Sequence, residues 1–314
     1  MKVIIAGGSG FMGSHFVQYM AGKYPENQII NLDIYEDKQK LRSMEDMANY
    51  QFMRWNLTNR EAVFHLLDTV KPDIIINFAQ EQRDPCGMDS YAEKSETAAI
   101  NLLDACRTCG IRRYHHVSSE KIYGTRPPYH TPHIFTEETP IAVSDAFSPV
   151  MTDADLTARM YHRFDGLPVT ISRCSKNYGP YCSQNEFPFT VVRKALAEET
   201  IIPETDGETI NGWLYVADHC RALDLIINEG KDGEIYHIAS ESMLTKTEAV
   251  KTIVRILNKP EDLVYCSKDN GNHKRQSVLD TSKITQALGW VPSYDFETGL
   301  RKTILWYMTQ QNLD

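Results

Sequence analysis

Apolar runs alternate with amphipathic stretches along the first half of the chain. Asp73–Ala79 is a nearly continuous apolar run, which is typical of a strand buried on both faces. The other predicted strands are Val3–Ala6, Gln28–Leu32, Tyr50–Arg54, Arg113–Ser118 and Leu167–Arg173. The helices predicted between them are Phe11–Met20, Asn59–Val70, Tyr91–Cys109 and 150–164. This alternation predicts an α/β fold with a doubly wound parallel sheet.

After about residue 175 the pattern is less regular. Thr245 and Glu248 form a capping-box pair, which predicts a helix that runs to about Leu257. The other helices predicted here are Phe187–Glu198, Ala217–Asn228, Ser282–Leu288 and Phe296–Gln310, and the strands are Trp213–Val216 and Ile235–Ala239. We expect a smaller second domain, with one return of the chain to the main sheet near Trp213–Asn228.

Composition and charge exclude several classes of partner. The net charge is −9 and the sequence pI is about 5.6, which does not favour a nucleic-acid partner. No apolar run has the length of a membrane span, and the first strand begins without a signal-peptide pattern, so we expect a cytoplasmic protein. The seven cysteines are scattered. Cys106 and Cys109 form a CxxC near His115-His116, but one pair ends a helix and the other lies on a strand, so no metal site is predicted.

The most specific local pattern is the glycine-rich turn after the first strand. Gly7, Gly10 and Gly13 are spaced GxxGxxG between that strand and a helix. Such a turn lets a phosphate approach the backbone and the helix N-terminus. Asp33 ends the second strand, where a carboxylate can bind the ribose hydroxyls of an adenosine and repel a 2′-phosphate. The pattern predicts a dinucleotide site and favours NAD over NADP.

Ligands of open α/β sheets bind at the carboxyl ends of the strands. The corresponding segments here are Ala79–Glu81, Ser118–Lys121 and Arg173–Pro180. The proline-rich stretch Gly124–Pro149 is predicted to be a long loop over this edge.

Five segments together resemble one protein family. They are GGSGFMGS at 7–14, SSEKIYG at 118–124, YHRFDGLPVTISRCSKNYGPY at 161–181, WLYVADHCRAL at 213–223 and SKITQALGWVPSYDFETGLRKTILWY at 282–307. The chain therefore resembles the extended short-chain dehydrogenase/reductases that act on nucleotide-diphosphate sugars, most of all the dTDP-glucose 4,6-dehydratases. In that family NAD oxidises C4 of the sugar, the ketone acidifies C5, and epimerisation or loss of water follows before the hydride is returned.

The resemblance implies a Rossmann fold and assigns residues to it. It implies an NAD site formed by Gly7, Gly10, Phe11, Met12, Gly13, Asp33, Asn56, Leu57 and Ala79. It implies contacts to a nucleotide-diphosphate sugar from Glu81, Asn177 and Arg275. It places the NAD-binding domain at 1–175 and about 205–230, and the substrate domain at about 176–204 and 231–314. It also implies a homodimer formed by the helices near 91–109 and 150–164.

The catalytic pair of the family is missing. A tyrosine takes the hydroxyl proton there, and a lysine four residues later lowers its pKa. The register fixed by 161–181 places Phe147 and Met151 at these two positions, and neither can transfer a proton. The only literal YxxxK is Tyr19–Lys23, which lies at the far end of the first helix and is interpreted as a chance match.

Other departures cluster near the expected sugar. The family's Asp and Glu after the fifth strand are Glu120 and Lys121 here, and a phosphate-binding Arg is Asn211. One hypothesis is a moved acid/base, with Ser119, Glu120 and Lys121 as catalytic residues. Ser119 would hydrogen-bond the sugar hydroxyl, and Glu120 and Lys121 would be the proton acceptor and donor. In a variant of this hypothesis, a buried Lys121 with a lowered pKa is the base. Tyr129, His130 and His133 on the long loop are further candidates, and a solvated Glu120–Lys121 ion pair is the structural alternative.

Two other hypotheses stay open. The chain could be a catalytically silent relative that binds NAD and a nucleotide sugar and regulates or scaffolds a partner. Alternatively, Phe147 and Met151 were introduced to trap a ligand, which the additional changes at Glu120, Lys121 and Asn211 argue against.

Overall fold

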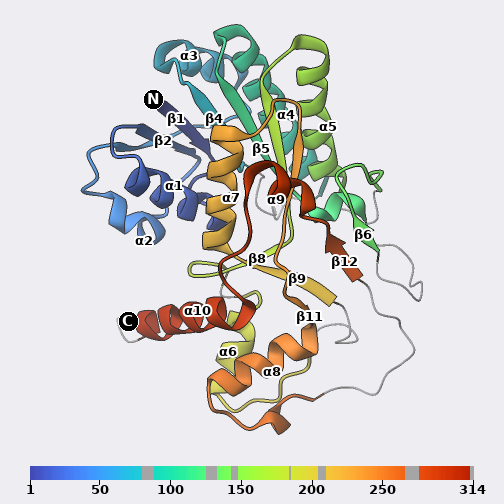
Figure 1. Ribbon diagram of the computed structural model, residues 1–314. Helices are drawn as coiled ribbons and strands as arrows, with labels where there is room; N and C mark the ends of the chain where they lie inside the picture. The colour runs from blue at the N-terminus through green and yellow to red at the C-terminus, as the bar shows by residue number, and fades with distance from the viewer. Residues whose placement is uncertain are drawn as a thin grey trace.

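A parallel sheet is the centre of the molecule (Figure 1). The computed structural model describes residues 1–79, 88–124, 133–142, 148–183, 185–203, 210–265 and 276–311. In this part of the chain the sheet has seven strands in the order β3-β2-β1-β4-β5-β7-β10, and every pairing is parallel. The strands are β1 (Lys2–Ala6), β2 (Gln28–Asp33), β3 (Tyr50–Arg54), β4 (Ile74–Asn77), β5 (Arg113–Ser119), β7 (Val169–Cys174) and β10 (Ile235–Ile238).

Helices cover both faces of this sheet. One face packs against α1 (Phe11–Lys23), α7 (Val216–Glu229) and α9 (Ser282–Leu288), and α2 (Lys38–Leu41) adds Leu41 to the same core. The other face packs against α3 (Arg60–Val70), α4 (Met88–Cys109) and α5 (Ser148–Asp165). The predicted doubly wound α/β fold is confirmed. The apolar runs of the central strands are buried from both sides, which explains their lack of a polar face.

A second, smaller sheet lies below the first (Figure 1). Its strands are β9 (Ile210–Tyr215), β11 (Met243–Thr245), β12 (Gln276–Leu279), β6 (Ile134–Phe135) and β8 (Lys176–Tyr178), with β9 paired to three of the others. The helices α6 (Phe189–Leu196), α8 (Lys246–Ile256) and α10 (Phe296–Gln311) pack with it around Tyr178, Trp213 and other aromatic side chains. The predicted capping box of Thr245 and Glu248 is present at the start of α8.

Strand pairing differs from the expected partition at two points. Trp213 was expected near a return to the main sheet, but β9 belongs to the smaller sheet, and only the following helix α7 packs against α1. Strand β10, expected in the second domain, pairs with β7 at the edge of the main sheet. A short apolar run predicts burial without saying which sheet it joins. The domain ranges themselves stay a prediction. Within the expected loop Gly124–Pro149, β6 pairs with β12.

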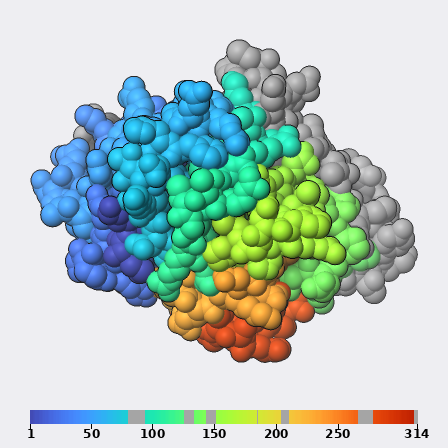
Figure 2. Space-filling model, turned by 90° about the horizontal axis from the view of Figure 1, so that it is seen from above, coloured from blue at the N-terminus to red at the C-terminus, as the bar shows by residue number. Residues whose placement is uncertain are grey.

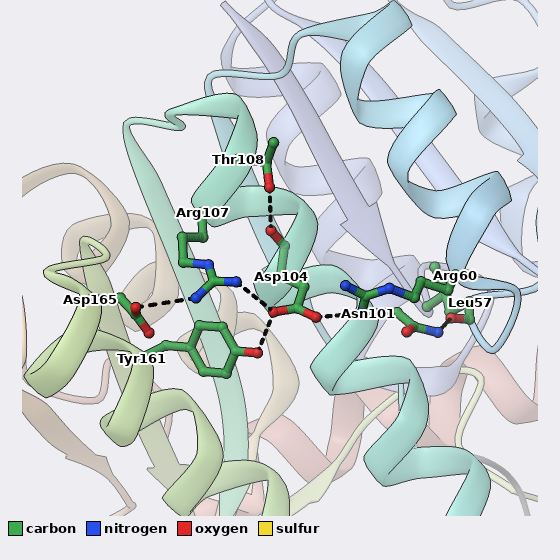
Figure 3. A network of polar contacts seen from close by, with 8 residues as sticks. All are labelled: Leu57, Arg60, Asn101, Asp104, Arg107, Thr108, Tyr161 and Asp165. Atoms are coloured by element: carbon green, nitrogen blue, oxygen red, sulfur yellow. Dashed lines mark hydrogen bonds and ion pairs between the residues drawn. The ribbon is translucent and has the colours of Figure 1, made fainter.

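A polar network ties three helices together on the outer layer (Figure 3). The carboxylate of Asp104 on α4 accepts a hydrogen bond from the Tyr161 hydroxyl at 2.6 Å and pairs with Arg60 and Arg107. Arg107 also pairs with Asp165 at 3.2 Å. Partial burial raises the pKa of Asp104, but the Tyr161 and Arg60 contacts outweigh it and hold that pKa below its usual range. The network fixes α3, α4 and α5 as one layer, and α4 and α5 lie side by side at the surface (Figure 2).

The CxxC and the two histidines are placed as expected. Cys109 ends α4, whereas His115 and His116 lie on β5. Among the described residues, no group of His, Cys, Asp and Glu side chains is arranged to hold a metal ion. No helix in the described ranges is long and apolar enough to cross a membrane.

Candidate active site

The glycine turn closes tightly against its neighbours. Gly7 has φ +77°, and its N–H donates to the Leu32 carbonyl at 2.8 Å. A Cβ at Gly7 would lie 2.7 Å from the Ala79 nitrogen, and one at Gly13 would collide with the Gly7 carbonyl oxygen. The turn therefore needs glycine at both positions, since the backbones of β1, β4 and α1 meet there.

The N-terminus of α1 fits an anionic group. Gly10 occupies the cap position, and in the described structure no side chain caps this end and no acid lies in the first turn. The helix begins at Phe11, so the N–H groups of Phe11, Met12 and Gly13 belong to the turn whose amides have no partner within the helix. Free N–H groups and the positive dipole end suit the pyrophosphate of a dinucleotide.

Asp33 ends β2 beside this turn. Its Oδ2 accepts from the Ser9 N–H at 3.0 Å, and its Oδ1 accepts from the Ile34 N–H at 2.8 Å. Burial raises the pKa of Asp33, and the backbone hydrogen bonds from Ser9 and Ile34 oppose that shift. The carboxylate is thereby oriented at the carboxyl edge of the sheet, where it can accept from ribose hydroxyls.

The other predicted cofactor residues lie at the same edge, after β3 and β4. Asn56 follows β3, and the carbonyl of buried Leu57 accepts from the Asn101 side chain at 2.9 Å (Figure 3). The Ala79 N–H after β4 donates to the Asn77 side chain at 2.9 Å. Strands β3, β2, β1 and β4 are consecutive in the sheet, so the fold brings these predicted positions to one edge. Their contacts with a cofactor stay a prediction.

Glu120 is the unusual group of the site. It lies in η2, a 3-10 helix (Glu120–Tyr123) that follows β5, and Ser119 caps this helix by accepting from the Lys121 N–H at 3.4 Å. The Glu120 side chain is buried, and its Oε2 has no hydrogen-bond partner among the described residues. Burial raises its pKa to about 7, opposed by the charges of Lys176 and Lys121. Lys121 is exposed, so the hypothesis of a buried lysine base is wrong.

Lys176 is a cation near the site that lies in the predicted segment Arg173–Pro180 but was assigned no role from the sequence alone. It lies on β8, and its ammonium is 5.6 Å from the centre of the Trp213 ring. Only the fold brings it near Glu120, since the two residues follow different strands. Its neighbour Asn177 contacts His219 on α7, with 3.1 Å between Asn177 Oδ1 and His219 Nδ1. This contact occupies the Asn177 side-chain oxygen within the protein, and a sugar contact from Asn177 stays a prediction.

Met151 packs in an apolar cluster. It lies in the first turn of α5 and contacts a group formed by Ile122, Tyr123, Phe135, Ala239 and Leu279. The methionine thioether is not ionisable, so this side chain supplies no charge next to η2. Five predicted positions lie outside the described residues: Glu81, Tyr129, His130, Phe147 and Arg275. His133 is described, and it is half-buried just before β6.

A buried polar network behind η2 was not predicted from the sequence. Arg173 on β7 makes two hydrogen bonds to Asp155 on α5, at 2.8 and 3.0 Å, and donates to the Tyr123 hydroxyl at 2.7 Å. That hydroxyl lies 2.6 Å from His237 Nε2, while His237 Nδ1 faces the Asp280 carbonyl. Burial lowers the pKa of His237 to about 3, so its ring is neutral. The network anchors η2 to β7, α5 and β10.

The doubly wound sheet, the glycine turn and Asp33 together define a Rossmann protein with a dinucleotide-type site. The family model described as GDP-mannose 4,6 dehydratase matches residues 4–303. The chain belongs to this family of nucleotide-sugar dehydratases and epimerases, as the resemblance of its motifs implied.

Individual relatives agree over nearly the full length. The dTDP-glucose 4,6-dehydratase of Escherichia coli is 31% identical, over 99% of this chain and 94% of that protein. The low-salt glycan biosynthesis protein Agl12 of Haloferax volcanii is 31% identical, over 98% of this chain and 99% of its own length. The crystal structure of dTDP-glucose 4,6-dehydratase from Bacillus anthracis in complex with NAD superimposes with a TM-score of 0.90, at 31% identity over 99% and 98% of the two chains.

Proposed function

We propose that this chain is an NAD-dependent enzyme of the 4,6-dehydratase/epimerase type that acts on a nucleotide-diphosphate sugar, with Glu120 as its proton-transferring group. One observation carries the proposal. Glu120 combines burial, an oxygen without a hydrogen-bond partner among the described residues and a pKa near 7 at the carboxyl end of β5. Such a carboxyl is populated in both protonation states near neutral pH, which suits general acid/base chemistry.

The cofactor is NAD. The glycine turn and the N-terminus of α1 would hold its pyrophosphate, and Asp33 would hold the adenosine ribose. When bound, NAD accepts a hydride from a sugar carbon and returns it later. The assignment is supported by the NAD complex of the similar structure from Bacillus anthracis.

The proton and hydrogen-bond chemistry is assigned to Glu120 of η2 and to Ser119, the residue that caps this helix. Ionised Glu120 takes a proton from the sugar and returns it when protonated, and the nearby charges of Lys176 and Lys121 stabilise the ionised form. The Ser119 hydroxyl, which is half-exposed, would donate a hydrogen bond to a sugar oxygen.

A second candidate function is a silent relative that binds NAD and a nucleotide sugar without turnover. Met151 favours it, because this residue, which the resemblance assigns to the position of the family's lysine, packs in an apolar cluster. Incubation with NAD and a panel of nucleotide sugars separates the two, with 4-keto sugar and NADH followed by absorbance. The enzyme is supported by turnover that is lost in Glu120→Gln and kept in Glu138→Gln, a control at an exposed site. Tight NAD binding without turnover of any sugar supports the silent relative.

The proposed assembly is a homodimer through α4 and α5. Leu156, Met160 and Phe164 form an apolar stripe along α5, and their side chains are 39%, 56% and 73% exposed. Residues four apart lie on one helix face, so the stripe is continuous and suits a helical partner surface. A cytoplasmic location also stays part of the proposal.

A further inference from the structure

Two opposite charges meet on the backbone of Ser9 in the glycine turn. The Ser9 N–H donates to Asp33 Oδ2 at 3.0 Å, and the Ser9 carbonyl accepts from Lys40 Nζ at 3.3 Å. Because the amide and the carbonyl belong to one residue, the ammonium and the carboxylate are neighbours at the same turn. The family motifs did not single out Lys40.

Asp37 holds this ammonium in place. Its Oδ2 lies 2.8 Å from Lys40 Nζ, and its Oδ1 accepts from the Lys40 N–H at 3.1 Å, which also caps α2. Both side chains are largely buried, 18% exposed for Lys40 and 22% for Asp37. The Gln18 side chain donates to the Lys40 carbonyl at 2.7 Å, so α2 is fixed against α1. Lys40 therefore cannot turn freely into solvent.

The charges around the ribose position decide which dinucleotide is accepted. Within the cluster formed by Asp33, Asp37 and Lys40, the two carboxylates contribute two negative charges and the ammonium contributes one positive charge. A 2′-phosphate would add up to about two negative charges at this place, as a phosphate monoester does near neutral pH. While Asp37 is ionised the local balance stays negative, which disfavours such a phosphate. Without the Asp37 charge, Lys40 balances Asp33 and is available to the phosphate.

We propose that the Asp37–Lys40 ion pair sets the cofactor specificity of this chain: Asp37 engages the Lys40 ammonium beside Asp33 and so excludes a dinucleotide with a 2′-phosphate. This inference rests on the proposed function, since it presumes that a dinucleotide binds at the glycine turn. Asp37 is thus a specificity residue that belongs neither to the glycine motif nor to the end of β2, where Asp33 lies.

The test is a titration of the purified chain with NAD and with NADP by isothermal calorimetry. Asp37→Asn keeps a side-chain oxygen for the cap of α2 and removes only the charge. We expect it to raise NADP affinity about tenfold, which is about 1.4 kcal/mol, while NAD affinity stays within about threefold. The double variant Asp37→Asn/Lys40→Met should lose the gain. The matched control is Asp46→Asn, which removes an exposed acid after α2 and should change neither affinity.

Two results would overturn the specificity role. One is an NADP affinity of Asp37→Asn equal to that of the Asp46→Asn control. The other is a gain that persists in the double variant, because the cation would then not be Lys40. In both cases NAD still binds, so the proposed function survives. A wild-type chain that binds neither dinucleotide overturns the proposed function and this inference together.

Discussion

The guanidinium of Arg173 lies over the ring of Tyr123 and also donates to its hydroxyl. The carbon at the centre of the guanidinium is 5.2 Å from the ring centre, and the hydrogen bond is 2.7 Å long. Both side chains are fully buried, as is Asp155, which neutralises the arginine. Since Tyr123 closes η2, this pair connects the stability of the fold to the position of Glu120.

Removal of the arginine should be strongly destabilising. Arg173→Met leaves the Asp155 carboxylate buried without its partner, and we expect a loss of about 3–5 kcal/mol in the free energy of unfolding. Arg173→Met/Asp155→Leu removes both charges and should recover most of that loss. Urea unfolding measures both variants. Equal stability of the single and the double variant would show that the buried charge is not the cause.

Burial of Glu120 should make stability depend on pH. Its pKa is raised from 4.5 to about 7 in the fold, so the folded chain binds the extra proton between these values. The wild type should therefore lose about 3 kcal/mol relative to Glu120→Gln as the pH rises from 4.5 to 7, and the difference should be constant above that. Denaturant unfolding across this range measures it. Parallel stability curves for the two proteins would contradict the raised pKa.

Gly13 should be required for both the turn and the cofactor. In Gly13→Ala the new Cβ meets the backbone of Gly7 and Gly8, and we expect at least a tenfold loss of NAD affinity with about 1–3 kcal/mol of destabilisation. Gly22→Ala is the matched control on the same helix, since its Cβ would enter open space. The control should stabilise the chain by about 0.5–1 kcal/mol and leave NAD binding unchanged. Calorimetric NAD titration and urea unfolding separate the two effects.

The apolar stripe on α5 should control the oligomeric state. Met160→Glu/Phe164→Glu places two charges in the proposed interface, and light scattering after gel filtration should then give the mass of a monomer. Leu305→Glu alters an exposed apolar residue on α10, 66% exposed, and should keep the dimer. A monomeric wild type, or dissociation by the Leu305→Glu control as well, would exclude this interface.

Much of the fold could be predicted because buried strands and helix faces require apolar residues at regular positions in the sequence. The strand Asp73–Ala79 and the capping box at Thr245 were recognised from local sequence, and both are present within a residue or two at the ends. The sheet to which β10 belongs could not be predicted, since pairing with β7 depends on contacts more than 60 residues apart in sequence. Local periodicity contains no information on such pairings.

The same limit applies to side-chain partners. Tyr19 and Lys23 were interpreted as a chance YxxxK, and they are in fact hydrogen-bonded to each other at 3.1 Å. Both also contact the buried carboxylate of Asp224 on α7, and burial raises the pKa of Tyr19, so the group joins two helices and is not tuned for proton transfer. Lys176 lies in the segment Arg173–Pro180 that was expected at the ligand edge. Its effect on the pKa of Glu120 could not be predicted, because that effect depends on where the two side chains lie in the folded chain.

The anchoring of η2 has a consequence for how a sugar would be processed. Tyr123 is held by β7 through Arg173 and by β10 through His237, and the backbone of His237 is in turn held by Glu137 near the smaller sheet. The Glu120 carboxyl, which lies in this anchored helix, is therefore held at one position in the fold. Successive proton transfers to different sugar atoms then require the ring to shift or turn past Glu120, so the mobility of the bound sugar, more than that of the protein, would set the order of the chemical steps.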